Sequence, residues 1–286
     1  MSVSSEKDII EIKSLLKLLD DDDEQIYTMA RDRLLAHGEK VLTLLPETGK
    51  DTSAVAEQRF NEIRELLCRS VFKDQFRQLK KDSGGDVDLE EGVFLIARQR
   101  YPNLDFTPYT KQLNDFALEL KQKLSTTTDQ TEILHRTVAF FSEEKGFTGN
   151  REDYYSENNH YINRVLETKT GIPITLSIVY LLVGRRINLP LNGIGLPGHF
   201  TMCFSFDTKN IYFDPFNNGK ILTRGDCEMV VKNLGFTFSE EYLYPVTNRQ
   251  ILERMLRNII LSLEKREEKD RIETIRQFID SLNSNV

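Results

Sequence analysis

One stretch, residues 171–219, limits what this chain can fold into more than any other part of it. It reads GIPITLSIVYLLVGRRINLPLNGIGLPGHFTMCFSFDTKNIYFDPFNNG. Its first third carries apolar residues on most sides of a 3.6-residue period, which is typical of a buried helix. Alternation over 199–206 and 211–214 then predicts two strands, and Asn218-Gly219 predicts a turn back into residues 220–223. A buried helix followed by such strands indicates an α+β fold.

The chain before this stretch is a succession of amphipathic helices. Residues 6–46 have the spacing of a helical hairpin whose layout resembles one HEAT-type repeat. A long helix is expected from about Ala54 to Leu79. The segment KKDSGG, residues 80–85, is the best candidate for a linker. We therefore predict a helical N-terminal domain over residues 1–80.

The second part of the chain is expected to form a core domain over residues 86–245, closed by a C-terminal helical hairpin over 246–286. Its first helices fall near 87–101, 108–124 and 129–145 by apolar spacing. A lone helix pair buries its apolar face by packing on a neighbouring body, so we expect the terminal hairpin to dock on the core.

Composition excludes several classes of function. A formal net charge of −7 argues against a protein that follows nucleic-acid phosphates. No apolar run approaches the roughly 18 residues of a membrane span, and the first residues lack the layout of a signal peptide. The three cysteines are widely spaced and form no C-x-x-C pair, so we read them as reduced thiols of a cytoplasmic protein.

Glycines at positions 193, 195 and 198 spell a literal G-x-G-x-x-G. The dinucleotide fingerprint needs a strand before these glycines and a helix after them, whereas here a helix precedes and a strand follows. We therefore expect no nucleotide, and assign the glycines to a tight turn that passes close to His199. No ligand cluster has the spacing of a zinc site, so neither a metal nor another cofactor is expected.

Three features of residues 171–219 stand in an order that suits nucleophilic chemistry. They are a helix N-terminus, a histidine that opens the first strand (His199) and an aspartate in the second strand (Asp214). An aspartate that accepts a hydrogen bond from a histidine fixes its tautomer, and the histidine can then deprotonate a thiol or hydroxyl. The alternative is a buried His–Asp hydrogen bond that only satisfies two polar groups.

This order of elements resembles the transglutaminase-like, papain-like cysteine superfamily. More narrowly, an Asn-rich segment followed by GIPITLS-x-x-Y, LPGHF and DPF-x-x-G resembles the SirB-type transglutaminase-like family of bacteria, over about residues 86–227. The helix VDLEEGVFLIARQRYPNLD and the terminal helix pair also look like that family, which often ends in tetratricopeptide-like helices. The resemblance implies a transglutaminase-like core and places His199 and Asp214 on the superfamily's histidine and aspartate.

The superfamily's nucleophile does not carry over. The resemblance would place its cysteine near residues 173–175, where the sequence has none. Thr175 and Ser177 lie in the first turns of the right helix and are candidate catalytic residues. A hydroxyl is a weaker nucleophile than a thiolate and needs close contact with a histidine and an oxyanion hole. Otherwise Thr175 helps to cap the helix, and Ser177 packs or bonds the backbone.

Two thiols are further candidates for the nucleophile. Cys203 lies four residues after His199, or about 13 Å along a strand, beyond the reach of proton transfer. Cys227 begins a helix, which could acidify its thiol, although its position after the aspartate does not fit the family. A helix-cap or core role is the alternative for Cys227.

Four polar residues are candidates for lining a cleft around the His–Asp pair, with loop capping and packing as their default roles: Asn158, Asn163, Tyr180 and Asn217.

The sequence therefore favours a degenerate transglutaminase-like protein, a pseudoenzyme with a binding or regulatory role. It is expected to bind a peptide or protein partner through the former active-site cleft and its helical surfaces. The alternative is an acyl-transfer or amide-hydrolysing enzyme that uses Thr175, Ser177 or Cys227 with His199 and Asp214. A third hypothesis is a structural scaffold whose cleft is filled by side chains. We expect no nucleic-acid or membrane partner, and the oligomeric state stays open.

Overall fold

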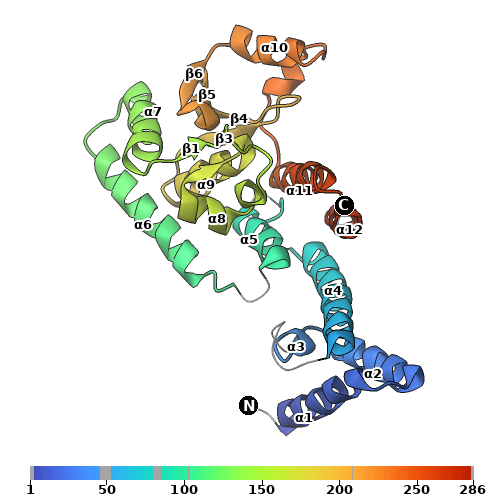
Figure 1. Cartoon of the computed structure of the whole chain (residues 1–286). Helices are drawn as coiled ribbons and strands as arrows, with labels where there is room; N and C mark the ends of the chain where they lie inside the picture. Colours follow the sequence, from blue (N-terminus) through green and yellow to red (C-terminus); the bar gives the residue numbers. More distant parts are fainter. Residues whose placement is uncertain (1–2, 46–52, 80–84, 102–103, 208, 285–286) are drawn as a thin grey trace. The chain divides into compact units, whose positions relative to one another are not determined.

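The computed structural model describes residues 3–45, 53–79, 85–101, 104–207 and 209–284 (Figure 1). The predicted linker at 80–85 lies outside the described residues, apart from Gly85. The chain divides into two compact units, Met1–Gln78 and Leu79–Val286.

The first unit is helical. Leu19, Leu34 and Ile63 are among the residues of its apolar core. Helix α2 begins where the Asp23 carboxylate accepts a hydrogen bond from the backbone N–H of Gln25 at 2.8 Å, because an aspartate at this position satisfies a free N–H of the first turn. The elements are α1 (Val3–Lys17), η1 (Leu18–Asp20), α2 (Glu24–His37), α3 (Glu39–Leu42) and α4 (Ala54–Arg77).

Helix α9 (Pro173–Arg186) is the central helix of the second unit. Pro173 occupies its first turn, where a missing N–H costs nothing, and its residues from Pro173 to Gly184 are buried. The preceding helix α8 ends at Thr168, and its C-cap Lys169 has a φ of 61°. The other elements before α9 are α5 (Leu89–Arg100), α6 (Thr107–Leu124), α7 (Gln130–Ala139), the π-helical turn η2 (Phe140–Glu144), β1 (Thr148–Gly149), η3 (Glu157–His160), α8 (Ile162–Thr168) and β2 (Thr170–Gly171).

A four-stranded antiparallel sheet follows α9 within the described residues, in the order β3-β4-β5-β6. Its strands are β3 (Leu191–Ile194), β4 (Thr201–Phe206), β5 (Lys209–Asp214) and β6 (Lys220–Leu222). Strands β4 and β5 are the two predicted ones, and β6 is the predicted return from the Asn218-Gly219 turn. Strand β3 was not predicted, and it pairs with β4 through Gly193 and Met202.

The two faces of this sheet meet different helices. Phe213 faces α9, where its ring lies 5.8 Å from that of Tyr180. Cys203, whose register partner is Tyr212, faces the other way and belongs to an apolar cluster with Cys227 of α10 (Arg224–Asn233). Helices α9 and α10 therefore pack on opposite faces of the sheet (Figure 1). The small antiparallel sheet and its helices confirm the predicted α+β class.

The chain ends in the predicted helical hairpin, α11 (Asn248–Glu264) and α12 (Lys269–Asn283), after the short η5 (Glu240–Leu243). The hairpin packs on α5 and the residues before it. The Asn248 side chain donates to the Val87 carbonyl at 2.8 Å, and Leu252 packs so closely on Gly92 that a Cβ there would lie 2.3 Å from a leucine methyl. Among the described helices, none is long and apolar enough to cross a membrane.

Candidate functional site

His199 lies in the loop between β3 and β4, two residues before β4 begins. The sequence had placed it at the start of the strand. Its backbone N–H donates to the Leu196 carbonyl at 3.1 Å, and Gly198 between them has a φ of 70°. This φ belongs to the left-handed region that favours glycine, so the tight turn before His199 depends on Gly198.

Asp214, the last residue of β5, is hydrogen-bonded to His199. The His199 Nε2 lies 2.8 Å from the Asp214 Oδ2. The carboxylate also accepts from the Asn217 side chain at 2.5 Å and from the Phe216 N–H at 2.9 Å. Burial would raise the pKa of Asp214, but the hydrogen bonds and the charge of His199 outweigh it, so the net pKa is lowered. Asp214 is therefore an anion that orients the ring by Nε2 and leaves Nδ1 for another partner.

A cavity of about 510 Å³ opens at this pair. Helix α10 contributes Met229 and Val230 to its lining, and together with Leu234, the residue after the helix, they form an apolar surface. The lining residues are Gly198, His199, Asp214, Asn217, Lys220, Leu222, Asp226, Met229, Val230, Asn233 and Leu234. Among these described lining residues there is no serine, threonine or cysteine, and none belongs to α9.

The two candidate hydroxyl nucleophiles lie in the interior and bond the backbone. The Thr175 hydroxyl donates to the Asn159 carbonyl at 2.8 Å and accepts from the Ile172 N–H at 3.1 Å. The Ser177 hydroxyl donates to the Pro173 carbonyl at 2.8 Å. These are the capping and backbone-bonding roles that the sequence offered as alternatives.

Of the two roles considered for Cys227, its surroundings match the core role. Its thiol is buried in the apolar cluster under α10, and burial raises its pKa to about 11, with a further contribution from the negative charge of Asp226. Burial also raises the pKa of Cys203, whose sulfur lies 3.4 Å from the Ser205 hydroxyl. A thiol held in its neutral form is a poor nucleophile.

Of the four residues predicted to line a cleft, the structure places Asn217 in the His199 cavity. Asn158 is exposed on η3 and accepts a hydrogen bond from Arg164 at 3.1 Å. Asn163 is buried on α8, and Tyr180 is buried on α9 with its ring 4.0 Å from that of Phe141. None of these three lines the His199 cavity.

The sequence did not predict that α10 lines the His199 cavity. It also did not predict that a residue of α11 binds the loop that carries His199. Arg254 of α11 donates from Nη2 to the carbonyls of Leu196 and His199, at 2.9 and 2.8 Å. For metals, no three His, Cys, Asp or Glu side chains come together in the part of the chain that is described.

We compared the sequence with families of known proteins, and one family matches. A profile described as the transglutaminase-like superfamily matches residues 107–257, slightly more than half of the 286 residues. A UPF0162 protein of Xylella fastidiosa is 32% identical over 179 residues, which are 60% of this chain and 64% of that protein. UPF0162 protein YchA of Escherichia coli is 24% identical over 200 residues, 68% of this chain and 65% of that protein.

A further relative, human F-box only protein 21, is 35% identical over 147 residues, which are 48% of this chain and 23% of that protein. The chain thus spans less than two thirds of the length of each of these three relatives. No solved structure matches it.

Proposed function

Because the chain belongs to the transglutaminase-like superfamily, we propose that it is a non-catalytic member, of the SirB type, that binds a segment of a peptide or protein partner in the His199 cavity. The observation that carries this proposal is the composition of the cavity. It keeps the hydrogen-bonded pair of His199 and Asp214, yet its described lining offers no thiol or hydroxyl to act as nucleophile.

The chemistry of the cavity suits an extended peptide. Its volume, about 510 Å³, is in the range of pockets that bury small ligands or a few side chains. Met229 is 56% exposed and Leu234 is 51% exposed, so an apolar side chain of a partner can remove both from water. The His199 ring and the Asn217 amide supply polar groups that can fix the orientation of a peptide backbone.

The proposal is tested by selecting peptides from a displayed random library against the whole chain. Affinities of the selected peptides are then measured for Met229→Ser and for Met29→Ser, a matched control at a methionine of the first unit that is 47% exposed. We expect Met229→Ser to weaken binding by about tenfold, since it removes apolar contact area, and Met29→Ser to change it less than twofold. Equal affinities for the two variants would contradict the proposal.

A turnover assay distinguishes this non-catalytic function from the alternative, an acyl-transfer or amide-hydrolysing enzyme. The chain and its His199→Ala variant are assayed with amide, ester and amine-donor substrates. We expect no turnover by either protein. Turnover that His199→Ala abolishes would contradict the non-catalytic function and would favour acyl transfer or amide hydrolysis instead.

A further inference from the structure

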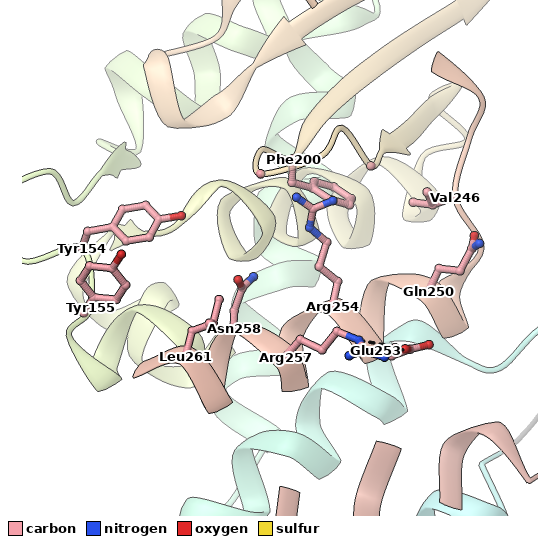
Figure 2. A pocket seen from close by; sticks show the side chains of 12 residues that line it. Tyr154, Tyr155, Phe200, Val246, Gln250, Glu253, Arg254, Arg257, Asn258 and Leu261 are labelled. Carbon is pink, nitrogen blue, oxygen red and sulfur yellow. Dashed lines mark hydrogen bonds and ion pairs between the residues drawn. The ribbon is translucent and has the colours of Figure 1, made fainter. Parts of the chain in front are cut away.

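A second cavity, of about 720 Å³, lies on the other side of the loop that carries His199. Figure 2 shows Tyr154 and Tyr155 at one end, Val246 and Gln250 at the other, and Arg254 between them, rising from α11 to the ring of Phe200. The lining residues are Tyr154, Tyr155, Gly195, Gly198, Phe200, Val246, Gln250, Glu253, Arg254, Arg257, Asn258 and Leu261. This cavity has no part in the proposed function.

Arg254 is the charged group at the centre of this cavity. Its Nη2 bonds two backbone carbonyls, and its guanidinium lies 5.6 Å from the centre of the Phe200 ring. Among the described residues, no carboxylate forms an ion pair with Arg254, and its Nε and Nη1 hydrogens have no hydrogen-bond acceptor. Burial lowers its pKa, although the nearby Tyr154 opposes this. The five N–H donors of an arginine form a fork that suits a carboxylate, and Arg254 keeps its Nε and Nη1 donors available for one.

The other charges of the wall cancel. Arg257 donates to the Glu253 carboxylate from Nη2 at 2.6 Å and from Nε at 3.0 Å, so these two form a neutral pair at the rim. Arg254 therefore leaves the lining with a net charge of +1. A single unpaired guanidinium matches a singly charged anion better than a phosphate dianion, which usually requires several donors or a helix N-terminus.

Apolar groups beside the guanidinium indicate what accompanies the anion. Tyr155 and Leu261 are 47% and 51% exposed, although both belong to the wall of the cavity. Tyr154 packs edge-on against Tyr155 with ring centres 5.4 Å apart. Aromatic rings at this separation form a surface on which another ring can pack.

From the unpaired guanidinium and the tyrosine surface together, we propose that this cavity binds an acidic peptide segment, with a glutamate or aspartate carboxylate on Arg254 and a neighbouring aromatic side chain on Tyr155 and Leu261. The proposal does not depend on the His199 cavity, because the two cavities share only Gly198 among their lining residues.

The test uses acetyl-Phe-Glu-amide as probe and acetyl-Phe-Gln-amide as its neutral match. Binding to the whole chain is followed by the NMR signal of the Gly195 amide, which belongs to this cavity alone, and peptides of the His199 cavity are followed at Leu222. We expect the glutamate probe to shift Gly195 saturably and the glutamine probe to bind at least tenfold more weakly, because the charge-assisted bond to Arg254 is lost.

A substitution that spares the Arg254 contacts to the loop keeps the test independent of folding. Asn258 lies one helical turn beyond Arg254 and lines the same cavity. Asn258→Asp supplies an internal carboxylate at the (i, i+4) position, which competes for the guanidinium and repels an acidic ligand. We expect this variant to bind acetyl-Phe-Glu-amide at least tenfold more weakly, and the control Asn258→Ala to stay within threefold of the native chain.

Three results would overturn the proposal. The first is equal affinity for the two dipeptides, and the second is unchanged affinity in Asn258→Asp. The third is a Gly195 shift by inorganic phosphate at lower concentration than by acetyl-Phe-Glu-amide, which would make the ligand a phosphate. If acetyl-Phe-Glu-amide does not shift the Gly195 signal, peptides can still bind in the His199 cavity and shift the Leu222 signal. Failure of this proposal is therefore distinguishable from failure of the proposed function.

Discussion

The Arg254 side chain donates a hydrogen bond to the backbone carbonyl of His199 at 2.8 Å, across 55 positions of sequence. The histidine is thus held at two points, its ring by Asp214 of β5 and its backbone by α11. The C-terminal hairpin therefore helps to position the site as well as completing the fold.

Glu157 should make the stability of the fold sensitive to acid. Its carboxylate accepts from Arg100 at 2.8 Å, from Arg271 at 2.5 Å and from Arg266 at 3.0 Å. Burial opposes its ionisation, but the Arg271 and Arg100 side chains outweigh it and lower the pKa of Glu157 to about 2. A lowered carboxylate pKa stabilises the fold above the unfolded pKa, near 4.5, and this contribution disappears as the pH falls toward 2.

We accordingly expect Glu157→Gln to cost about 2 kcal/mol of unfolding free energy at pH 7, since each pKa unit corresponds to about 1.4 kcal/mol and solvent screening of this half-buried carboxylate reduces the full value. Urea unfolding across pH measures this, and the gap between native and variant should narrow below pH 4.5. The exposed Glu152 provides the control, Glu152→Gln, which should change stability by less than about 0.5 kcal/mol. A gap that stays constant with pH would refute the assignment.

His160 should remain neutral well below the usual range of histidine. It is buried, and neither ring nitrogen has a hydrogen-bond partner among the described residues. Burial lowers its pKa to about 4, although Glu157 opposes this. The unfolded chain then binds more protons between pH 6.5 and 4, so the contribution to stability is complete above pH 6.5 and is lost as the pH falls through that window.

The measurement is an NMR titration of the histidine ring signals, assigned with His160→Phe. We expect the His160 signal to stay unchanged from pH 7.5 to 5. The variant should also flatten the dependence of stability on pH between 6.5 and 4, by roughly 3 kcal/mol over the whole window. A ring that titrates near pH 6.5 in the folded chain would count against the burial seen here.

Substitution of Gly198 should disturb the turn before His199. A Cβ at this position would lie 2.2 Å from a Leu234 methyl, and the φ of 70° adds backbone strain. We expect Gly198→Ala to cost about 3 kcal/mol and Gly235→Ala, at another positive φ with no atom within 4 Å of the added Cβ, about 1 kcal/mol.

Thermal unfolding of the double variant Gly198→Ala/Leu234→Ala provides the check, because it removes the clash and keeps the strain. We expect it to be more stable than Gly198→Ala alone. Strictly additive effects of the two substitutions would mean that Leu234 does not pack on Gly198.

Thr175→Val should lower the stability of the fold. The substitution keeps the shape of the side chain but leaves the buried Ile172 N–H and Asn159 carbonyl without the partner that the hydroxyl supplies. We expect a cost of about 2 kcal/mol in chemical unfolding, and less than about 1 kcal/mol for Thr175→Ser, which retains the hydroxyl. Native stability in Thr175→Val would show that these hydrogen bonds are weak or absent.

The sequence predicted the parts of the fold that depend on local pattern. The continuous apolar residues of α9, the alternation in β4 and the Asn218-Gly219 turn each carry their signal within a few residues, and all three were found. Strand β3 was missed because its four residues, LNGI, include a glycine and pair with β4 only through tertiary contact.

The His199–Asp214 pair of the candidate site could also be predicted from local pattern. The pairing of His199 with Asp214 follows from two neighbouring strands, and the hydrogen bond between them is present. The apolar part of the cavity lining could not be predicted, since Met229 of α10 and Leu234 just after it are exposed and lack the spacing that marks a buried face. Arg254 was missed because it stands between Glu253 and Met255 on an amphipathic helix, where an arginine usually faces solvent.

Strand β4 buries side chains on both of its faces, with Met202 and Phe204 on the α9 side and Thr201 and Cys203 on the α10 side. Amides in such a doubly covered strand exchange with solvent only in the rarest openings of a domain. His199 lies two residues before Thr201, the first residue of β4 that pairs with β3. The His199 imidazole is therefore attached to a strand that we expect to open rarely. Local motions of the loops and side chains around the two cavities should leave the position of the ring unchanged.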